Sequence, residues 1–198
     1  PPQSERQEVV FLGAAGQRII SAGEILGLAA LSGGLHASQK NEYNVTVLRG
    51  PSIAELILSP EPIDYNGSMT PSIIMALANE GVERRQEIFS RLGGEVLILQ
   101  APGVKRRQEI FSRLGGEVLI LQAPGVKLPP CAAQVTPVDF KAMGIKRSDW
   151  ALASLAVPAR MNRVLTWEML EAAVEIRFQG KTLAAVQAMI EKVTGGYA

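Results

Sequence analysis

Cysteine and histidine are almost missing from this chain of 198 residues. Cys131 is the single cysteine and His36 the single histidine. One cysteine cannot close an internal disulfide, and no C-x-x-C spacing offers ligands to zinc or to an iron–sulfur cluster. His36 has no Asp, Cys or Ser at a recognisable catalytic spacing. We therefore expect no metal ligands and no catalytic triad in this chain, and a histidine at the surface or at a strand end.

A strong charge of one sign and a long hydrophobic run are also absent. The chain has 20 Lys and Arg against 19 Asp and Glu, a formal net charge of +1, so no field attracts nucleic acid or lipid. No stretch reaches the roughly eighteen apolar residues that a membrane span needs. The polar start PPQSERQE lacks the basic and apolar regions of a signal peptide. We expect a cytoplasmic protein whose partner is a protein or a small molecule.

The most informative stretch is residues 8–32, which predicts a buried strand, a tight turn and a long helix. Residues 9–12 form an unbroken apolar run, which is typical of a strand covered on both faces. Gly13 and Gly16 bracket the turn, where the backbone must pass sharply from sheet to helix. One stripe of the following helix is apolar and predicts its buried face: Ile19, Ala22, Leu26 and Ala29.

Strand-like and helix-like segments alternate along the rest of the chain. Strands are expected at 35–38, 43–48, 52–59, 71–78, 95–100 and 132–135, and helices at 83–92, 138–143, 148–156, 166–178 and 182–193. This alternation favours a layered α/β fold with a mostly parallel sheet. We therefore expect one domain over residues 1–198, a three-layer Rossmann-like sandwich with a helical C-terminal third.

One segment of the chain is duplicated. Residues 84–105 recur letter for letter at 106–127. Natural structural repeats diverge and come in at least three copies, so two identical copies indicate a very recent tandem duplication, an engineered insertion or an error in the recorded sequence. Each copy encodes one helix and one strand, and we expect only one copy to fit the core. We assign the repeat no function.

Few single residues indicate chemistry. Gly13, Gly16 and Gln17 at a strand-to-helix junction could hold a phosphate or carboxylate on free N–H groups, or they could form a tight turn that only packs the helix on the sheet. Cys131 has no positive neighbour that would activate a thiol, so we interpret it as a small buried residue. Trp150 and Trp167 lie on amphipathic segments, where tryptophan is a core residue or an interface anchor.

The order of these features resembles a known family. The segment GAAGQRIISAGEILGLAA is similar to the G-x-G-G-Q-G-x-x-x-A-x-x-I-L-x-x-A-A opening of the gamma subunits of 2-oxoacid:ferredoxin (acceptor) oxidoreductases, the pyruvate synthase and 2-oxoglutarate synthase group. The matching positions are Gly13, Gly16, Gln17, Ala22, Ile25, Leu26, Ala29 and Ala30.

A second segment, LRGPSIAELILSPEPIDY, resembles that family's R-G-G motif followed by a strand and S-x-E-P-I. The matching positions are Arg49, Gly50, Ser59, Glu61, Pro62 and Ile63. Ala15 and Arg18 stand where the family has glycines, and Pro51 replaces the second glycine of R-G-G. These departures lie in expected turns, and the resemblance covers nearly the whole chain apart from one copy of the repeat.

The resemblance implies a non-catalytic gamma subunit of an enzyme complex. In that reaction a 2-oxoacid and coenzyme A give an acyl-CoA and carbon dioxide, and electrons pass to ferredoxin or another acceptor. Thiamine diphosphate, Mg²⁺ and [4Fe-4S] clusters are then expected in the partners, which are alpha and beta thiamine-binding subunits and an iron–sulfur subunit, with coenzyme A nearby. The chain itself has no G-D-G motif followed by a paired asparagine that would hold thiamine-bound Mg²⁺, so we expect it to be inactive alone.

Two other hypotheses compete with this one. The chain could be a free-standing nucleotide-binding module that uses the Gly13–Gln17 turn, or a structural adaptor unrelated to redox metabolism. Under the leading hypothesis, the residues expected to face a partner are Arg49, Gly50, Trp150 and Trp167.

Overall fold

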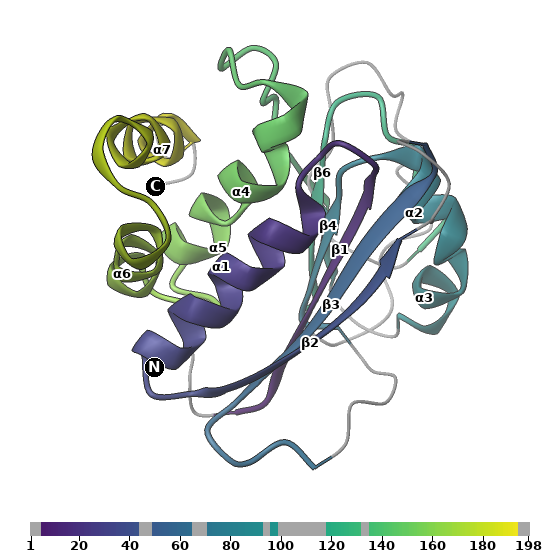
Figure 1. Cartoon of the computed structure of the whole chain (residues 1–198). Coiled ribbons are helices and arrows are strands. Elements are labelled where there is room, and N and C mark those ends of the chain that lie inside the picture. Colours follow the sequence, from purple (N-terminus) through teal and green to yellow (C-terminus); the bar gives the residue numbers. More distant parts are fainter. Residues whose placement is uncertain are drawn as a thin grey trace.

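A computed structural model describes residues 5–43, 49–64, 71–92, 96–98, 118–131 and 135–193 (Figure 1). Its strands are β1 (Gln7–Ala14), β2 (His36–Tyr43), β3 (Pro51–Ser59), β4 (Ile73–Ala76), β5 (Val96–Ile98), β6 (Val118–Gln122) and β7 (Val135–Pro137). Its helices are α1 (Ile19–Ser32), α2 (Asn79–Arg84), α3 (Gln86–Arg91), the 3₁₀ turn η1 (Arg147–Asp149), α4 (Trp150–Ser154), α5 (Ala156–Arg160), α6 (Trp167–Arg177) and α7 (Gly180–Val193).

The strands form one mixed sheet in the order β2-β3-β1-β4-β6-β5-β7, and β7 also pairs with β6. β3 runs antiparallel to both of its neighbours, whereas the pairs from β1 to β7 are parallel. The prediction of a mostly parallel sheet is thus confirmed. Because β1, β4, β6 and β7 end at the same edge and β3 begins there, we call it the carboxyl edge.

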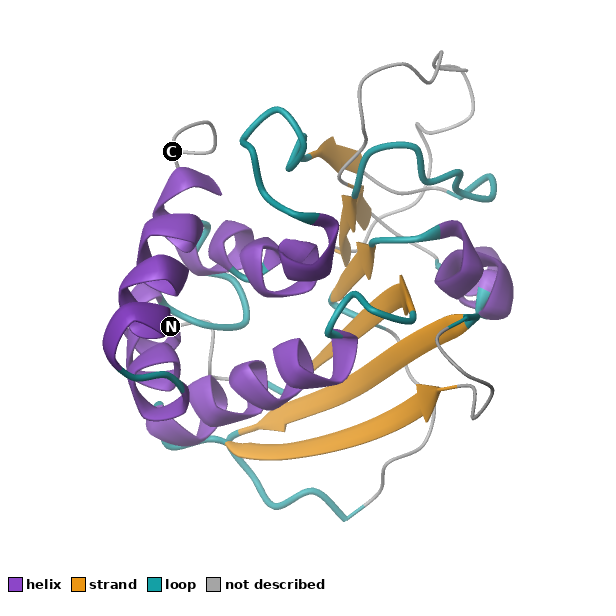
Figure 2. Cartoon of the chain, turned by 45° about the horizontal axis from the view of Figure 1, so that its top comes forward, coloured by secondary structure: helices purple, strands orange, loops and turns teal. Residues whose placement is uncertain are grey.

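Helices cover both faces of this sheet, as the sandwich prediction required. α1 and the C-terminal helices α4–α7 lie on one face, and α2 and α3 lie on the other (Figures 1 and 2). α6 packs along α1, and α7 packs on α4 and α6. Among the described residues, no helix is long and apolar enough to cross a membrane.

β1 is the centre of the core because both of its faces are covered. Its residues from Glu8 to Ala14 are all buried, and the stripe of α1 predicted to face inward is buried as well. On the opposite face, Gly81 of α2 lies so close to β1 that an added Cβ would overlap the backbone of Leu12 and Gly13. A glycine at position 81 therefore lets α2 pack directly on the strand.

Three predicted helices differ from the structure, and local chemistry explains two of the differences. The segment 138–143 forms a hydrogen-bonded turn, in which the carboxylate of Asp139 accepts the N–H of Ala142 at 2.9 Å, and Gly144 adopts a positive φ of 70°. The predicted helix 148–156 is divided into η1, α4 and α5. Pro158 has no N–H to donate to the carbonyl of Ser154, so the helix is interrupted at Leu155.

The predicted helix 83–92 is also two helices, α2 and α3, which meet at Arg85. Other predictions are confirmed with small shifts. Thr166 caps α6, because its Oγ1 accepts the N–H of Met169 at 3.3 Å, and Gly34 follows α1 with a φ of 78°. Parts of the strands expected at 43–48, 95–100 and 132–135 lie outside the described residues.

Both copies of the duplicated segment contribute elements to the described fold. The first copy supplies α3, where Phe89 is buried against the core. The second copy supplies β6, which pairs with β4. β5 carries the same three letters as the start of β6, and the two strands pair with identical residues opposite each other, Val96 against Val118. The described fold therefore uses a helix and a short strand from the first copy and a strand from the second.

This arrangement predicts that one copy is dispensable. Deleting either copy gives the same shortened sequence, in which residues 92–95 join α3 directly to a strand identical in sequence to β6. A four-residue connection is ordinary between a helix and a strand. We expect the shortened chain to fold with an equal or higher melting temperature, because its connection closes with less loss of entropy. A lower melting temperature in calorimetry would show that β5 contributes packing that the core needs.

An ion-pair network ties the α2–α3 junction to the sheet. Arg85 donates to Glu55 of β3 at 3.1 Å and also to Glu42 of β2, which accepts a further bond from Arg84. From the sequence alone, Glu55 could face the rim of the sheet or pair with a residue such as Arg49; in the structure its partner is Arg85. Partial burial raises the pKa of Glu42, but the two arginine hydrogen bonds outweigh that effect and hold the pKa below its ordinary 4.5.

We expect Glu42→Gln to lower the free energy of unfolding at neutral pH by about 1 kcal/mol, since the network is partly exposed. A lowered carboxyl pKa stabilises the fold above the ordinary pKa and loses that effect as the pH falls through the folded value. The gap between variant and wild type should therefore shrink below pH 4.5 in urea titrations at several pH values. Glu24→Gln, at an exposed position of α1, serves as the control, and a gap that does not depend on pH would contradict this account.

Candidate functional site

The glycine turn between β1 and α1 lies at the carboxyl edge, where ligands bind in many open α/β sheets. Gly16 has a φ of 85° and Arg18 a φ of 53°. Arg18 stands just before α1 with no side-chain cap hydrogen bond. This local geometry is the one that the spacing of Gly13 and Gly16 predicts for a sharp passage from strand to helix.

The side chain of Gln17 fills the inside of this turn. Gln17 is only 2% exposed. Its Oε1 accepts the N–H of Ala14 at 2.8 Å, and its Nε2 donates to the carbonyl of Leu77 at 3.1 Å. The amide thus joins the end of β1 to the residue that follows β4, and both of its polar atoms are used within the chain.

The two segments that carry the family resemblance meet in space. The N–H of Ala15 donates to the carbonyl of Gly50 at 3.0 Å, and the β1–β3 register places Ala14 opposite Pro51. Gly50 has a φ of 103°, and the neighbouring Arg49 is exposed. The glycine turn and the Arg49–Gly50 loop therefore form one continuous surface region.

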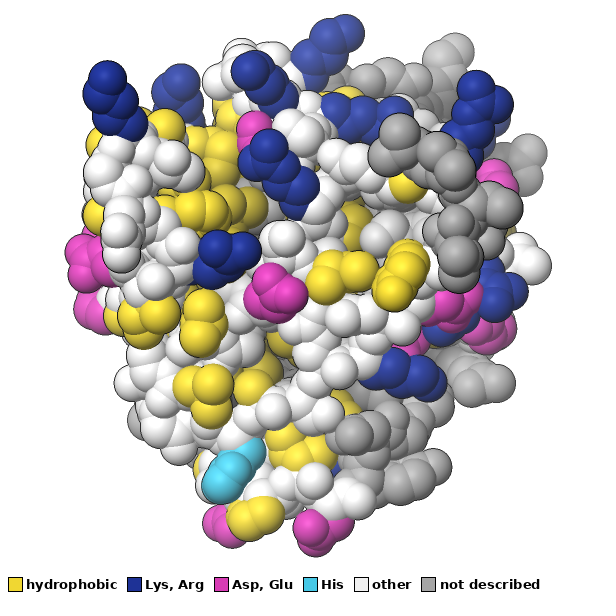
Figure 3. Space-filling view, viewed as in Figure 1, with side chains coloured by type: hydrophobic (Ala, Val, Ile, Leu, Met, Phe, Trp, Pro, Cys, Tyr) yellow, Lys and Arg dark blue, Asp and Glu magenta, His cyan; other side chains and the backbone are white. Residues whose placement is uncertain are grey.

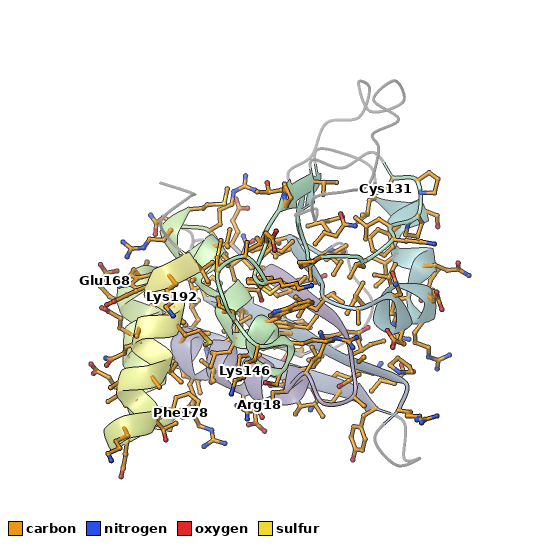
Figure 4. The ribbon with its side chains drawn as sticks, turned by 90° about the horizontal axis from the view of Figure 1, so that it is seen from above. Arg18, Cys131, Lys146, Glu168, Phe178 and Lys192 are labelled. Carbon is orange, nitrogen blue, oxygen red and sulfur yellow. The ribbon has the colours of Figure 1, made fainter. Side chains whose placement is uncertain are left out.

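Arg18 connects this region to the C-terminal helices. Its side chain is 69% exposed and pairs with Asp149, the last residue of η1, at 3.0 Å. Figure 4 looks down onto the carboxyl edge and shows Arg18 and Lys146 in the same part of the surface, with Cys131 far from both. The loop that precedes α4 thus lies beside the glycine turn.

Asn79 is a structural member of this edge that the sequence analysis missed. Its Oδ1 accepts the N–H of Lys127 at 2.6 Å, and its Nδ2 donates to the carbonyl of Gly125 at 3.4 Å. The signal was present in the sequence, because a polar side chain directly follows the apolar strand segment 73–78. Asn79 fixes the loop after β6 against the start of α2.

The remaining singled-out residues lie apart from this edge or inside the protein. His36 is exposed at the first position of β2, as predicted. Burial raises the pKa of the Cys131 thiol to about 12, so the thiolate needed for nucleophilic chemistry is scarce at neutral pH. Trp150 is 8% exposed and donates its Nε1–H to the carbonyl of Ile145 at 3.0 Å.

Trp167 is the more accessible tryptophan. It is half-buried at the start of α6, and the guanidinium of Arg160 lies 3.9 Å from the centroid of its ring. A cation at this distance over an indole ring is a stabilising contact. The two tryptophans thus take different roles, Trp150 in the core and Trp167 at the surface.

The backbone donors of the glycine turn are largely engaged within the chain. The N–H groups of Ala14, Ala15 and Gln17 all donate within the chain, which leaves fewer turn donors for a phosphate than the spacing suggests. Among the described residues, no three His, Cys, Asp or Glu side chains are grouped as metal ligands. A ligand contact by Gly13, Gly16 and Gln17 stays a prediction.

We expect Gln17→Leu to lower the free energy of unfolding by about 1–3 kcal/mol, because it leaves the Ala14 N–H and the Leu77 carbonyl buried without their partner. Gln179→Leu, at an exposed position just before α7, is the matched control and should change stability little. Urea unfolding of both variants tests this. Equal stability of the two variants would contradict the role assigned to the buried amide.

Comparison with known sequences places the chain near one group of proteins. Residues 8–198 match the family model for pyruvate ferredoxin/flavodoxin oxidoreductase. The 2-oxoglutarate synthase subunit KorC of Methanothermobacter marburgensis is 38% identical over 78 residues, which are 39% of this chain and 42% of that protein. KorC of Methanothermobacter thermautotrophicus is 34% identical over 94 residues, 47% and 49% of the two chains. The chain spans about half the length of these curated relatives.

Solved structures share the fold over almost the whole chain. The gamma subunit of a keto/oxoacid ferredoxin oxidoreductase from Geobacter sulfurreducens has a TM-score of 0.66 and 23% identity, covering 98% of this chain and all of that one. The 2-oxoglutarate:ferredoxin oxidoreductase of Magnetococcus marinus, solved with 2-oxoglutarate, coenzyme A and succinyl-CoA, has a TM-score of 0.71 and 16% identity, covering 96% of this chain and 30% of that one. At these identities the likeness concerns the fold.

Proposed function

The chain belongs to the pyruvate ferredoxin/flavodoxin oxidoreductase family, and we propose that it serves as the gamma subunit of a 2-oxoacid:ferredoxin (acceptor) oxidoreductase. The family match over residues 8–198 carries this proposal. The relatives named KorC and the gamma-subunit fold of the Geobacter protein support it. The complex would convert a 2-oxoacid and coenzyme A into an acyl-CoA and carbon dioxide and pass two electrons to the acceptor.

The reactive groups of such a complex would be held by other chains. A [4Fe-4S] cluster needs four cysteine thiolates, whereas this chain has one cysteine, and the burial of Cys131 disfavours its thiolate. The residues present do not fit a cluster, and we assign no step of the reaction to them. Thiamine diphosphate, Mg²⁺ and the clusters therefore belong, in this proposal, to the alpha and beta subunits and to an iron–sulfur subunit.

The work of this chain would be to bind and shape its partners. Arg49 and Gly50 lie in the surface region formed with the glycine turn, and Trp167 with Arg160 lies at the surface of the C-terminal helices. These residues are available to a partner subunit. Trp150 lies in the core, so its role in this proposal is to support that surface from within.

The free-standing nucleotide-binding module remains the rival. The inward hydrogen bonds of Gln17 and of the turn N–H groups do not favour it. Titration calorimetry of the purified chain with NAD, FAD and coenzyme A separates the two hypotheses. Tight binding of a dinucleotide by the chain alone would support the rival.

We expect the purified chain to show no 2-oxoacid-dependent reduction of an artificial acceptor. When it is mixed with its cognate thiamine-binding and iron–sulfur subunits, it should join their assembly, seen as co-elution in gel filtration, and activity with coenzyme A should appear or rise. The control mixture omits this chain. Full activity of the chain alone, or failure to join the assembly, would overturn the proposal.

A further inference from the structure

Exposed cations gather on the loops of the carboxyl edge. One precedes β3, one follows β6 and three lie on the segment after β7. We call this set the basic edge: Arg49, Lys127, Lys141, Lys146 and Arg147. Figure 3 shows more Lys and Arg than Asp and Glu side chains along the top of the molecule, where this edge and α7 lie. The net charge of the whole chain is near zero, but the surface at this edge is locally positive.

Carboxylates near the basic edge are mostly engaged by other groups. Asp149 pairs with Arg18 at 3.0 Å, and Asp139 accepts the N–H of Ala142 at 2.9 Å. Glu80 is exposed in the first turn of α2 and offsets one positive charge. No cation of the basic edge forms an ion pair with another residue in the described part of the chain. Their charge is thus available to a partner.

The arrangement fits a broad acidic surface better than a small anion. A small anion is held by donors that converge on one point, whereas these cations extend from three separate loops and the nearby turn donates its N–H groups inward. Tyr43, 62% exposed at the end of β2, adds aromatic surface at the same edge. Tyrosine and arginine are enriched where proteins contact one another.

We infer that the basic edge docks onto an acidic face of another protein, and this rests on the proposed function, in which that protein is a thiamine-binding subunit of the same complex. Exposed charges at an interface act mainly by guiding the two proteins together. Binding through the basic edge should therefore weaken as salt screens these charges.

The test compares Lys146→Glu with Lys181→Glu in the full-length chain. Both residues are exposed cations, and Lys181 lies on the first turn of α7 rather than on a loop of the carboxyl edge. Binding to the cognate thiamine-binding subunits is followed by surface plasmon resonance between low and high NaCl. We expect Lys146→Glu to slow association about tenfold at low salt, Lys181→Glu to leave it near the wild-type rate, and Lys146→Arg to preserve it.

Each outcome is decisive. If the wild type binds but Lys146→Glu associates as fast as Lys181→Glu, the docking inference is wrong and the proposed function stands. If the wild type does not bind the thiamine-binding subunits, the docking inference and the proposed function are both wrong. If inorganic pyrophosphate binds the lone chain in calorimetry and Lys146→Glu abolishes that binding, the edge is a small-anion site and the inference is overturned. Matching thermal unfolding of all variants excludes a folding defect.

Discussion

The buried amide of Gln17 is the interaction on which the candidate site depends. It accepts from Ala14 and donates to Leu77, so one side chain joins the ends of two neighbouring parallel strands. A polar group this deeply buried is stable only when its hydrogen bonds are made. The Gln17 side chain therefore both fills the inside of the turn and holds the turn against the end of β4. The surface residues around the turn are positioned by these two hydrogen bonds.

Strand direction then decides which loops share the carboxyl edge. Because β3 runs against β1, the Arg49–Gly50 loop reaches the glycine turn, and Gly50 accepts the N–H of Ala15. Because β7 runs with β6, the segment leading to η1 returns to the same edge, and Asp149 pairs with Arg18. Segments far apart in the sequence thus form one surface at the carboxyl edge.

Local sequence patterns predicted the central part of the fold, but they could not predict contacts between residues far apart in the sequence. The apolar run, the two glycines and the stripe of α1 lie within one stretch of sequence, so β1, the turn and α1 could be anticipated. The partner of Glu55 could not, because Arg85 approaches it from another helix and a nearer arginine offered the same charge. The glycine spacing indicated a turn at the edge, but the inward direction of the Gln17 side chain depends on Leu77, which follows a strand placed by tertiary structure.

The duplicated segment shows where this fold tolerates extra residues, because α3 comes from the first copy and β6 from the second. α3 and β6 keep their places in the core although the chain between them is longer by a whole repeat unit than the connection needs to be. The sandwich therefore has a natural insertion point between these elements, remote in sequence from the glycine turn. A reporter domain or affinity handle grafted there would add chain at a position where the fold already accepts a whole extra repeat unit.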